Sequence, residues 1–208
     1  MVRNVIVTRM YYDDREMLRK RAELMTETLI PALKAQVKQD FQFIIMSDKF
    51  IEDLKEIIDY DFIQLDTFED LINYCKENAV ISQTRVDSDD VLLPHYVHLL
   101  DYYLFEKYDQ EEILLNFNPL HWDLENDIPL ELETRYNNEN TSTFLTLINL
   151  KHTSHVYAHP HNKMRSYYKV DTVAGIHVLY NEHPDQIMKV PIEERKQLRQ
   201  TPKKKEQK

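Results

Sequence analysis

The alternation of apolar runs with segments of helical period constrains the fold most. Four short runs rich in β-branched and aromatic residues are typical of buried strands, at Asn4–Met10, Phe41–Met46, Phe62–Leu65 and Ala79–Arg85. Helices are predicted between them at Arg15–Lys38, Ile51–Ile58 and Glu69–Lys76, and Pro31 is expected to kink or restart the first. This order predicts an α/β fold with a mainly parallel sheet, helices on both faces and ligands beyond the carboxyl ends of the strands.

The second half of the chain has a less regular pattern. A helix is predicted at Pro94–Lys107, followed by extended segments at Glu112–Phe117, Ile128–Tyr136, Thr143–Leu150 and Val173–Tyr180. We interpret these segments as a partly antiparallel half that supplies the acceptor side of a cleft. The whole of residues 1–188 is expected to form one domain. Residues 189–208 carry eight Lys or Arg against three Glu and are expected to be a disordered basic tail.

Charge and glycine content exclude several function classes. The 208 residues have 26 basic and 36 acidic side chains, a net charge of −10, and so acidic a chain would repel nucleic acid. A single glycine excludes Gly-rich phosphate loops, so a bound nucleotide would need a metal and acidic residues to hold its diphosphate. The lone Cys75 is expected to be a buried, unreactive thiol. No apolar run reaches the roughly 18 residues of a membrane span, and we expect a cytoplasmic protein.

Three carboxylates crowd into four residues directly after the fourth predicted strand. Asp87, Ser88, Asp89 and Asp90 would repel one another unless a cation or several donors offset their charge. Carboxylates two residues apart on an extended segment point the same way, so Asp87 and Asp89 are candidates to share one Mg²⁺ or Mn²⁺. The alternative is that these acids cap a helix that begins near Val91, where Asp is favoured.

The segment around this loop resembles a known family. The string Gln83–Leu92 is similar to the Thr-Arg-x-Asp-x-Asp-Asp segment of the putative rhamnosyltransferase family, whose members are GT-A-like glycosyltransferases. Further matches occur in the same order along residues 4–165, and they are Val7, Thr8, Arg9, Arg21, Leu29, Pro31, Leu33, Gln36, Phe41, Phe43–Met46, Asp48, His159 and Asn162. The chain departs from the family in its shorter length, its near lack of glycine, and Pro160 and His161 where small residues are expected.

The resemblance implies a role for each matched residue. Asp89 would be the chief metal ligand, Asp87 would contact the ribose or a metal-bound water, and Asp90 would orient the pair. His159 or His161 would complete the metal shell, and Arg85 or Arg9 would contact phosphate bidentately. Thr8, Arg9 and Asp48 lie at predicted strand ends where GT-A enzymes hold the nucleoside, although polar residues also occur at solvated strand ends.

The acceptor side is less well defined by the sequence. If the enzyme inverts, a carboxylate must take the acceptor proton, and Asp123 is the candidate base, with Glu125 and Asp127 as alternatives. Trp122 is either a platform for a sugar ring or a core residue. The stereochemical outcome, the donor sugar and the base therefore stay open.

These residues support three hypotheses. The first is a metal-dependent transferase that moves a hexose or deoxyhexose, such as rhamnose, from a nucleotide-diphosphate sugar to a glycan acceptor. The second is a catalytically inactive domain of the same fold that binds a sugar nucleotide or a partner protein. The third is a metal-dependent phosphohydrolase that uses the same acids. Turnover and phosphate release from simple esters separate them.

Overall fold

The fold was described from a computed structural model that covers residues 4–107, 112–123, 128–129, 144–175 and 177–182. Its elements, in chain order, are β1 (Asn4–Arg9), α1 (Arg15–Glu27), α2 (Leu29–Lys34), β2 (Phe41–Met46), α3 (Ile51–Ile57), β3 (Ile63–Leu65), α4 (Phe68–Glu77), β4 (Ser82–Arg85), β5 (Val91–Leu92), α5 (Tyr96–Lys107), β6 (Glu112–Phe117), β7 (Leu120–Asp123), β8 (Ile128–Pro129), β9 (Leu145–Asn149), the 3₁₀ helix η1 (His161–Ser166), β10 (Val170–Val173) and β11 (Val178–Glu182).

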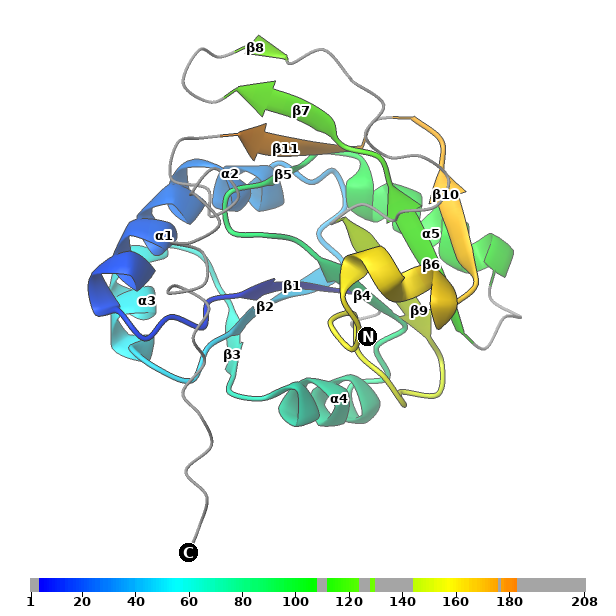
Figure 1. Ribbon diagram of the computed structural model, residues 1–208, viewed down its shortest axis with the longest axis horizontal. Coiled ribbons are helices and arrows are strands. Elements are labelled where there is room, and N and C mark those ends of the chain that lie inside the picture. Colours follow the sequence, from blue (N-terminus) through cyan, green and yellow to red (C-terminus); the bar gives the residue numbers. More distant parts are fainter. Residues whose placement is uncertain (1–3, 108–111, 124–127, 130–143, 176, 183–208) are drawn as a thin grey trace, which may run out of the picture.

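The larger of two sheets has seven strands in the order β10-β6-β9-β4-β1-β2-β3 (Figure 1). Strands β4, β1, β2 and β3 are parallel, and β9 runs antiparallel between β4 and β6. The predicted parallel sheet with a partly antiparallel second half is therefore confirmed. The smaller sheet has the order β5-β11-β7-β8 and lies beside α2.

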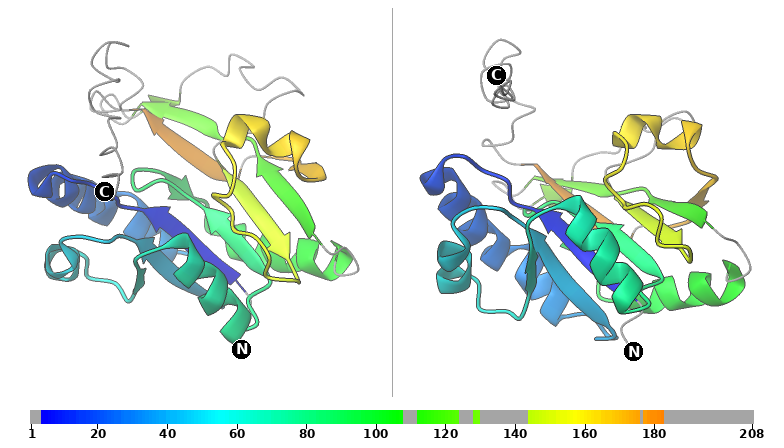
Figure 2. Two further views of the ribbon diagram at one scale, coloured as in Figure 1. Left: turned by 60° about the horizontal axis from the view of Figure 1, so that its bottom comes forward. Right: turned by 90° about the horizontal axis from the view of Figure 1, so that it is seen from below.

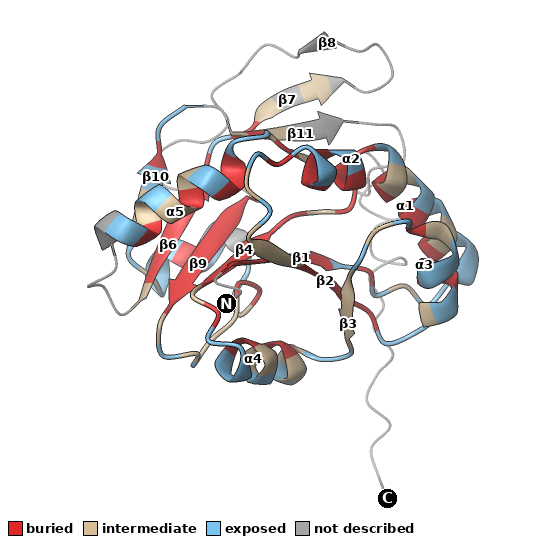
Figure 3. Cartoon of the chain, turned by 180° about the vertical axis from the view of Figure 1, so that it is seen from behind, coloured by how far each residue is buried: buried red, intermediate tan, exposed pale blue. Residues whose placement is uncertain are grey.

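Helices cover both faces of the seven-stranded sheet, as predicted. Side chains of α1, α2, α3 and α5 pack on the face that carries Ile6 and Phe43. Side chains of α4 and of residues 156–164 pack on the opposite face, which carries Val5 and Val7. This layering is visible when the sheet is viewed edge-on (Figure 2). Buried residues follow the central strands (Figure 3), because successive strand residues alternate between the two packed layers.

The predicted helix Arg15–Lys38 divides into α1 and α2 at Thr28. The Thr28 hydroxyl donates to the Leu24 carbonyl oxygen at 2.8 Å, and Pro31 lies in the first turn of α2, where its missing N–H is tolerated. The expectation that the helix is kinked or restarted near Pro31 is thus confirmed, although the break itself lies at Thr28. Helix α4 begins with a capping box between Thr67 and Asp70. It ends at Glu77, Ala79 has a φ of 52°, and β4 begins at Ser82.

One predicted segment and the helix-cap alternative for the acidic loop were wrong. Val173–Tyr180 is not one segment, because Gly175 (φ 92°) lies between β10 and β11, which belong to different sheets. Val91 does not begin a helix: residues Val91–Leu92 form β5, and α5 starts at Tyr96. The acids at 87–90 therefore do not cap a helix. Of the predicted strand Ile128–Tyr136, residues 130–136 lie outside the described residues.

Buried polar contacts fix the chain around β5. The Gln36 amide nitrogen donates to the carbonyl oxygens of Leu92 and Leu93 at 3.2 and 2.9 Å, and its oxygen accepts from the Val97 N–H at 3.1 Å. Gln36 thereby joins α2 to β5 and to the first turn of α5. Cys75 is fully buried, as expected, and burial raises the pKa of its thiol to about 12. No described helix combines the length and apolar character needed to cross a bilayer.

Candidate functional site

The acidic loop follows β4 at the carboxyl edge of the parallel strands. The Asp90 N–H donates to the Asp87 carbonyl oxygen at 3.2 Å, so residues 87–90 form a tight turn before β5. Ser88, Asp89 and Asp90 are buried, whereas Asp87 is half-buried. No described residue forms a hydrogen bond with the Asp87 carboxylate. Asp87 is therefore the acid of this loop that faces solvent.

Asp89 points to the α1 side of the sheet edge. Its Oδ2 atom accepts from Arg21 Nη1 at 3.2 Å, and the two side chains are only 11% and 10% exposed. The Thr28 hydroxyl, between α1 and α2, also contacts the Ser88 carbonyl oxygen at 3.3 Å. Burial raises the pKa of the nearby Tyr12 phenol, and Arg21 partly opposes this shift. A guanidinium group thus offsets part of the loop's negative charge.

Two arginines share one aromatic ring on the opposite face. Val7 of β1 pairs with Arg85 of β4, and Arg9 lies two residues beyond Val7, so all three side chains project from the same face. The Cζ atoms of Arg9 and Arg85 lie 4.4 and 4.9 Å from the centroid of the Tyr157 ring. Both distances are in the range of cation–π contacts. We call Arg9, Arg85 and Tyr157 the arginine cluster.

Tyr157 comes from the segment that follows β9. Its hydroxyl donates to the Val7 carbonyl oxygen at 2.8 Å. The Gln83 side chain brackets the same segment, since its Nε2 donates to the Ser154 carbonyl oxygen and its Oε1 accepts from the Val156 N–H, each at 3.2 Å. These three hydrogen bonds join a distant segment to β1 and β4. The ring of Tyr157 is therefore fixed at the sheet edge.

The predicted nucleoside residues lie at neighbouring strand ends. Asp48 is exposed after β2, and Arg9 is exposed at the end of β1, but Thr8 is fully buried and its hydroxyl forms no hydrogen bond with a described residue. Tyr11 lies nearby, where its hydroxyl donates to the Asp66 carbonyl oxygen at 2.8 Å and its ring meets Phe68 edge-on at 6.2 Å. Burial, followed by Asp48, raises the pKa of Tyr11 to about 12.

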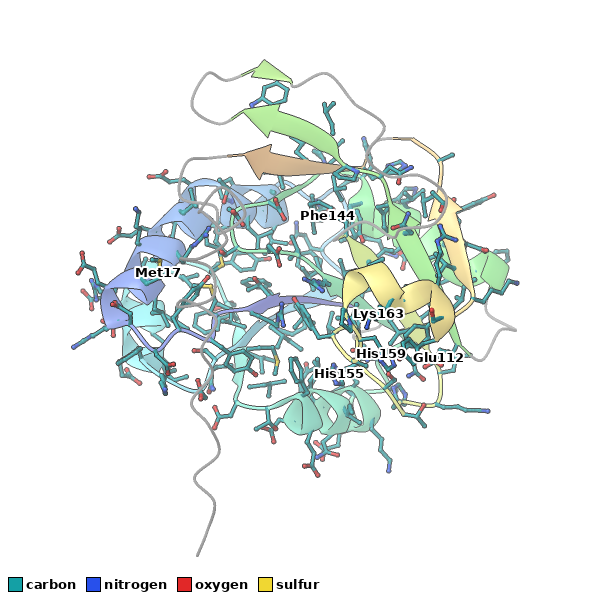
Figure 4. All side chains as sticks on the ribbon, in the orientation of Figure 1. Met17, Glu112, Phe144, His155, His159 and Lys163 are labelled. Carbon is teal, nitrogen blue, oxygen red and sulfur yellow. The ribbon has the colours of Figure 1, made fainter. Side chains whose placement is uncertain are left out.

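The histidines that follow β9 are engaged in aromatic stacks. His159 stacks on Tyr167 with centroids 3.6 Å apart, and His155 stacks on Phe68 at 4.4 Å. Figure 4 shows His155 beside α4 and His159 beside η1. Burial lowers the pKa of His155 to about 4, with smaller contributions from His159 and Arg9. The side chain of His161 lies outside the described residues.

The described residues fit a metal ion only in part. Among them, no three His, Cys, Asp or Glu side chains gather into a metal site. Asp87 faces solvent, and Mg²⁺ or Mn²⁺ is often held by one or two carboxylates together with substrate phosphate oxygens. Asp87 therefore fits such an ion, whereas the Asp89 carboxylate is in contact with Arg21.

On the acceptor side, the structure describes Trp122 but not the candidate base. Asp123 is the last residue of β7, its side chain lies outside the described residues, and Glu125 and Asp127 lie outside them altogether. Trp122 is partly exposed and lines a groove of about 380 Å³ with Thr28, Pro31, Leu92 and Leu179. It is therefore not a fully buried core residue.

The chain also matches a known protein family. The profile of the family described as putative rhamnosyl transferase matches residues 6–186. The chain belongs to this family. The predicted membership is thereby confirmed, and a search of curated proteins found no match.

Solved structures similar to this family member include three of S. aureus TarS. TarS 1-349 in complex with UDP-GlcNAc gives a TM-score of 0.56 at 11% identity, covering 94% of this chain and 64% of that one. Its complex with UDP gives 0.51 at 11% identity (88% and 61%), and the longer TarS gives 0.52 at 12% identity (88% and 37%). The protein thus spans less than two thirds of the length of these TarS chains. The likeness confirms the predicted GT-A-type fold.

Sequence reasoning missed Tyr157, Gln83 and the partner of Asp89. Tyr157 lies two residues before the His159 match, but no periodic pattern marks it, since its contacts are with strands about 70 to 150 residues away. Arg21 matched the family, which was the only available signal of its importance. The contact with Asp89 could not be read from spacing, because 68 residues separate the two.

Proposed function

We propose that this chain is a glycosyltransferase that moves a sugar, rhamnose or another hexose, from a nucleotide-diphosphate donor to a glycan acceptor. The observation that carries the proposal is that Arg9 and Arg85 contact the Tyr157 ring at the carboxyl edge of the parallel strands, and that Asp87 lies close enough to act electrostatically on the same tyrosine. Ligands of open α/β sheets bind at this edge. The family and the GT-A-type fold support the same activity.

The donor would lie across the ends of β1, β2 and β4. Asp48 is exposed at the end of β2, where a carboxylate can accept from a ribose hydroxyl or a base N–H. Arg9 and Arg85 present guanidinium groups that suit phosphate oxygens. The TarS complexes contain UDP and UDP-GlcNAc, which supports a sugar nucleotide as the ligand of this edge.

Asp87 would hold Mg²⁺ or Mn²⁺ together with oxygens of the donor diphosphate. Such an ion stabilises the charge that develops on the leaving diphosphate. The further metal ligands expected from the resemblance, Asp89 and His159 or His161, remain part of this proposal, as does the orienting role of Asp90. The pairing of Asp89 with Arg21 places a second cation next to the same loop.

The acceptor would approach from the side of the smaller sheet. The partly exposed Trp122 lines the groove on this side, and an aromatic ring is the group on which a sugar ring would stack. In an inverting transfer, Asp123 would take the proton of the acceptor hydroxyl while the acceptor oxygen forms a bond to the anomeric carbon of the donor sugar. The bond between that carbon and the diphosphate oxygen breaks, and its electron pair leaves with the diphosphate. Glu125 and Asp127 are alternative bases.

The test combines binding with turnover. Thermal unfolding is measured with UDP-, GDP-, dTDP- and CMP-linked sugars, each with and without Mn²⁺, because a ligand of the native state raises the unfolding midpoint. Asp87→Asn should remove the metal-dependent part of the shift and the turnover, and Asp13→Asn, an exposed acid of the β1–α1 loop, is the charge-matched control. Absence of any shift with any donor would overturn the proposal.

A second candidate is a catalytically inactive domain that binds a sugar nucleotide or a partner protein. The observation in its favour is that the Asp89 carboxylate already contacts Arg21, so one acid of the expected metal pair is engaged. This candidate predicts a thermal shift with a sugar nucleotide but neither transfer nor hydrolysis with Mn²⁺. A phosphohydrolase would instead release phosphate from simple esters.

A further inference from the structure

Arg9 and Arg85 differ from most other described arginines in their partners. Arg15, Arg19 and Arg21 each pair with a carboxylate, on Asp53, Glu56 or Asp89. Neither Arg9 nor Arg85 forms an ion pair with a described acid, although acids outnumber bases by ten in the chain. Arg85 is moreover only 8% exposed. A buried guanidinium without an anion is costly, so an anionic ligand is the expected partner.

The geometry of the arginine cluster leaves donor groups available. A guanidinium group over a ring face uses its own flat face for the contact, whereas its N–H donors lie in its plane. The buried Arg85 Nε forms no hydrogen bond with a described residue. One guanidinium is buried and the other is exposed, so the cluster reaches from the sheet edge to solvent. This arrangement suits a ligand with several anionic oxygens.

Tyr157 sets the position of both cations. The ring is held without help from either arginine. The Tyr157 hydroxyl donates to the Val7 carbonyl oxygen, and the Gln83 side chain accepts from the neighbouring Val156 N–H. Burial raises the pKa of the Tyr157 phenol, so the hydroxyl keeps its proton and remains a donor to Val7 at neutral pH. The ring is thus a fixed platform on which two flexible side chains are ordered before a ligand arrives.

We infer that Arg9 and Arg85, ordered on the ring of Tyr157, form a diphosphate-binding site that holds pyrophosphate without a divalent metal ion. The identity of the natural ligand, the diphosphate of a sugar nucleotide, rests on the proposed function. Tyr157 is a positioning residue in this site, and the two guanidinium groups are the binding groups. Inorganic pyrophosphate is the simplest probe, because it has the diphosphate and lacks base, ribose and sugar.

The experiment is calorimetric titration of the full chain with inorganic pyrophosphate in EDTA, at low and high salt. Arg9→Gln and Arg85→Gln should each weaken binding about tenfold or more, because a charge-assisted hydrogen bond is lost. Tyr157→Leu removes the ring and should weaken binding similarly, whereas Tyr157→Phe keeps the ring and should restore most of the affinity. Arg165→Gln removes an equal charge from an exposed arginine of η1 and is the control.

Equal affinity of Tyr157→Leu and the unmodified chain, or no binding of pyrophosphate in EDTA, would overturn the inference. If Tyr157→Leu does not fold, the exposed Arg9→Gln variant gives the answer, because this substitution leaves the core intact. Failure of the proposed function would look different. Pyrophosphate would still bind in EDTA, but no sugar nucleotide would be bound more tightly or turned over with Mn²⁺.

Discussion

Two acids of one loop should respond to the same substitution to very different extents. Asp89 is buried against Arg21, with Oδ2 and Nη1 3.2 Å apart, whereas Asp87 faces solvent. At this distance the attraction is about 5 kcal/mol for an effective dielectric constant near 20. Removing one member of a buried ion pair typically costs about 3–5 kcal/mol. Asp89→Asn should therefore destabilise the chain by roughly 3 kcal/mol, and Asp87→Asn by less than about 0.5 kcal/mol.

The assay is thermal and urea unfolding of the unliganded chain. For a chain of this size, 1 kcal/mol corresponds to about 2–4 °C, so Asp89→Asn should lower the midpoint by roughly 6–12 °C. Arg21→Met should cause a similar loss. The double variant should lose less than the sum of both, because the interaction between the two side chains is lost only once. The reasoning is refuted if Asp89→Asn leaves the midpoint unchanged or raises it, since mutual repulsion of the acids would then dominate.

Three further outcomes can be checked on the unliganded chain. The pKa of His155 is lowered to about 4 from 6.5, so the unfolded state binds more protons between these pH values and stability should fall as the pH drops from 6.5 to 4. Unfolding measured across that range should show a smaller loss for His155→Gln. An unchanged dependence of stability on pH would contradict this prediction. Ala79 has a φ of 52°, so Ala79→Gly should stabilise the chain by up to about 1 kcal/mol in urea, and a loss of stability would argue against strain there. The Cys75 thiol has a pKa raised to about 12 by burial, so a thiol reagent at pH 8 should label it only after denaturation, and rapid labelling of the native chain would show that it is accessible.

The first half of the fold could be predicted because its signals are local. Strands β1 and β2 are largely apolar runs with most of their residues buried, so a segment such as Phe41–Met46 is marked by composition alone. The loop at Asp87 could be placed at the sheet edge for the same reason, since it follows a strand directly. The two-residue strand β5 was missed because so short a pairing leaves no period in the sequence.

The assembly of the site could not be predicted, because its contacts join distant segments. Asp89 was expected to bind metal from its motif, but its contact with Arg21 depends on how α1 packs against the sheet. Tyr157 carried no motif of its own. Its place over Arg9 and Arg85 depends on the hydrogen bonds of Gln83, which a sequence pattern does not encode. The metal roles of Asp87, Asp89 and the histidines stay predictions.

The hydrogen bond from Tyr157 to Val7 has a consequence for the order of events during synthesis. The two residues are 150 positions apart, so β1 leaves the ribosome long before its partner exists. At about 5–20 residues per second, the interval is of the order of ten seconds. Strands β1 to β4 can pair in that time, but Arg9 and Arg85 cannot yet contact the Tyr157 ring. A nascent chain would therefore acquire its sheet first and its anion-binding edge only when the segment after β9 docks.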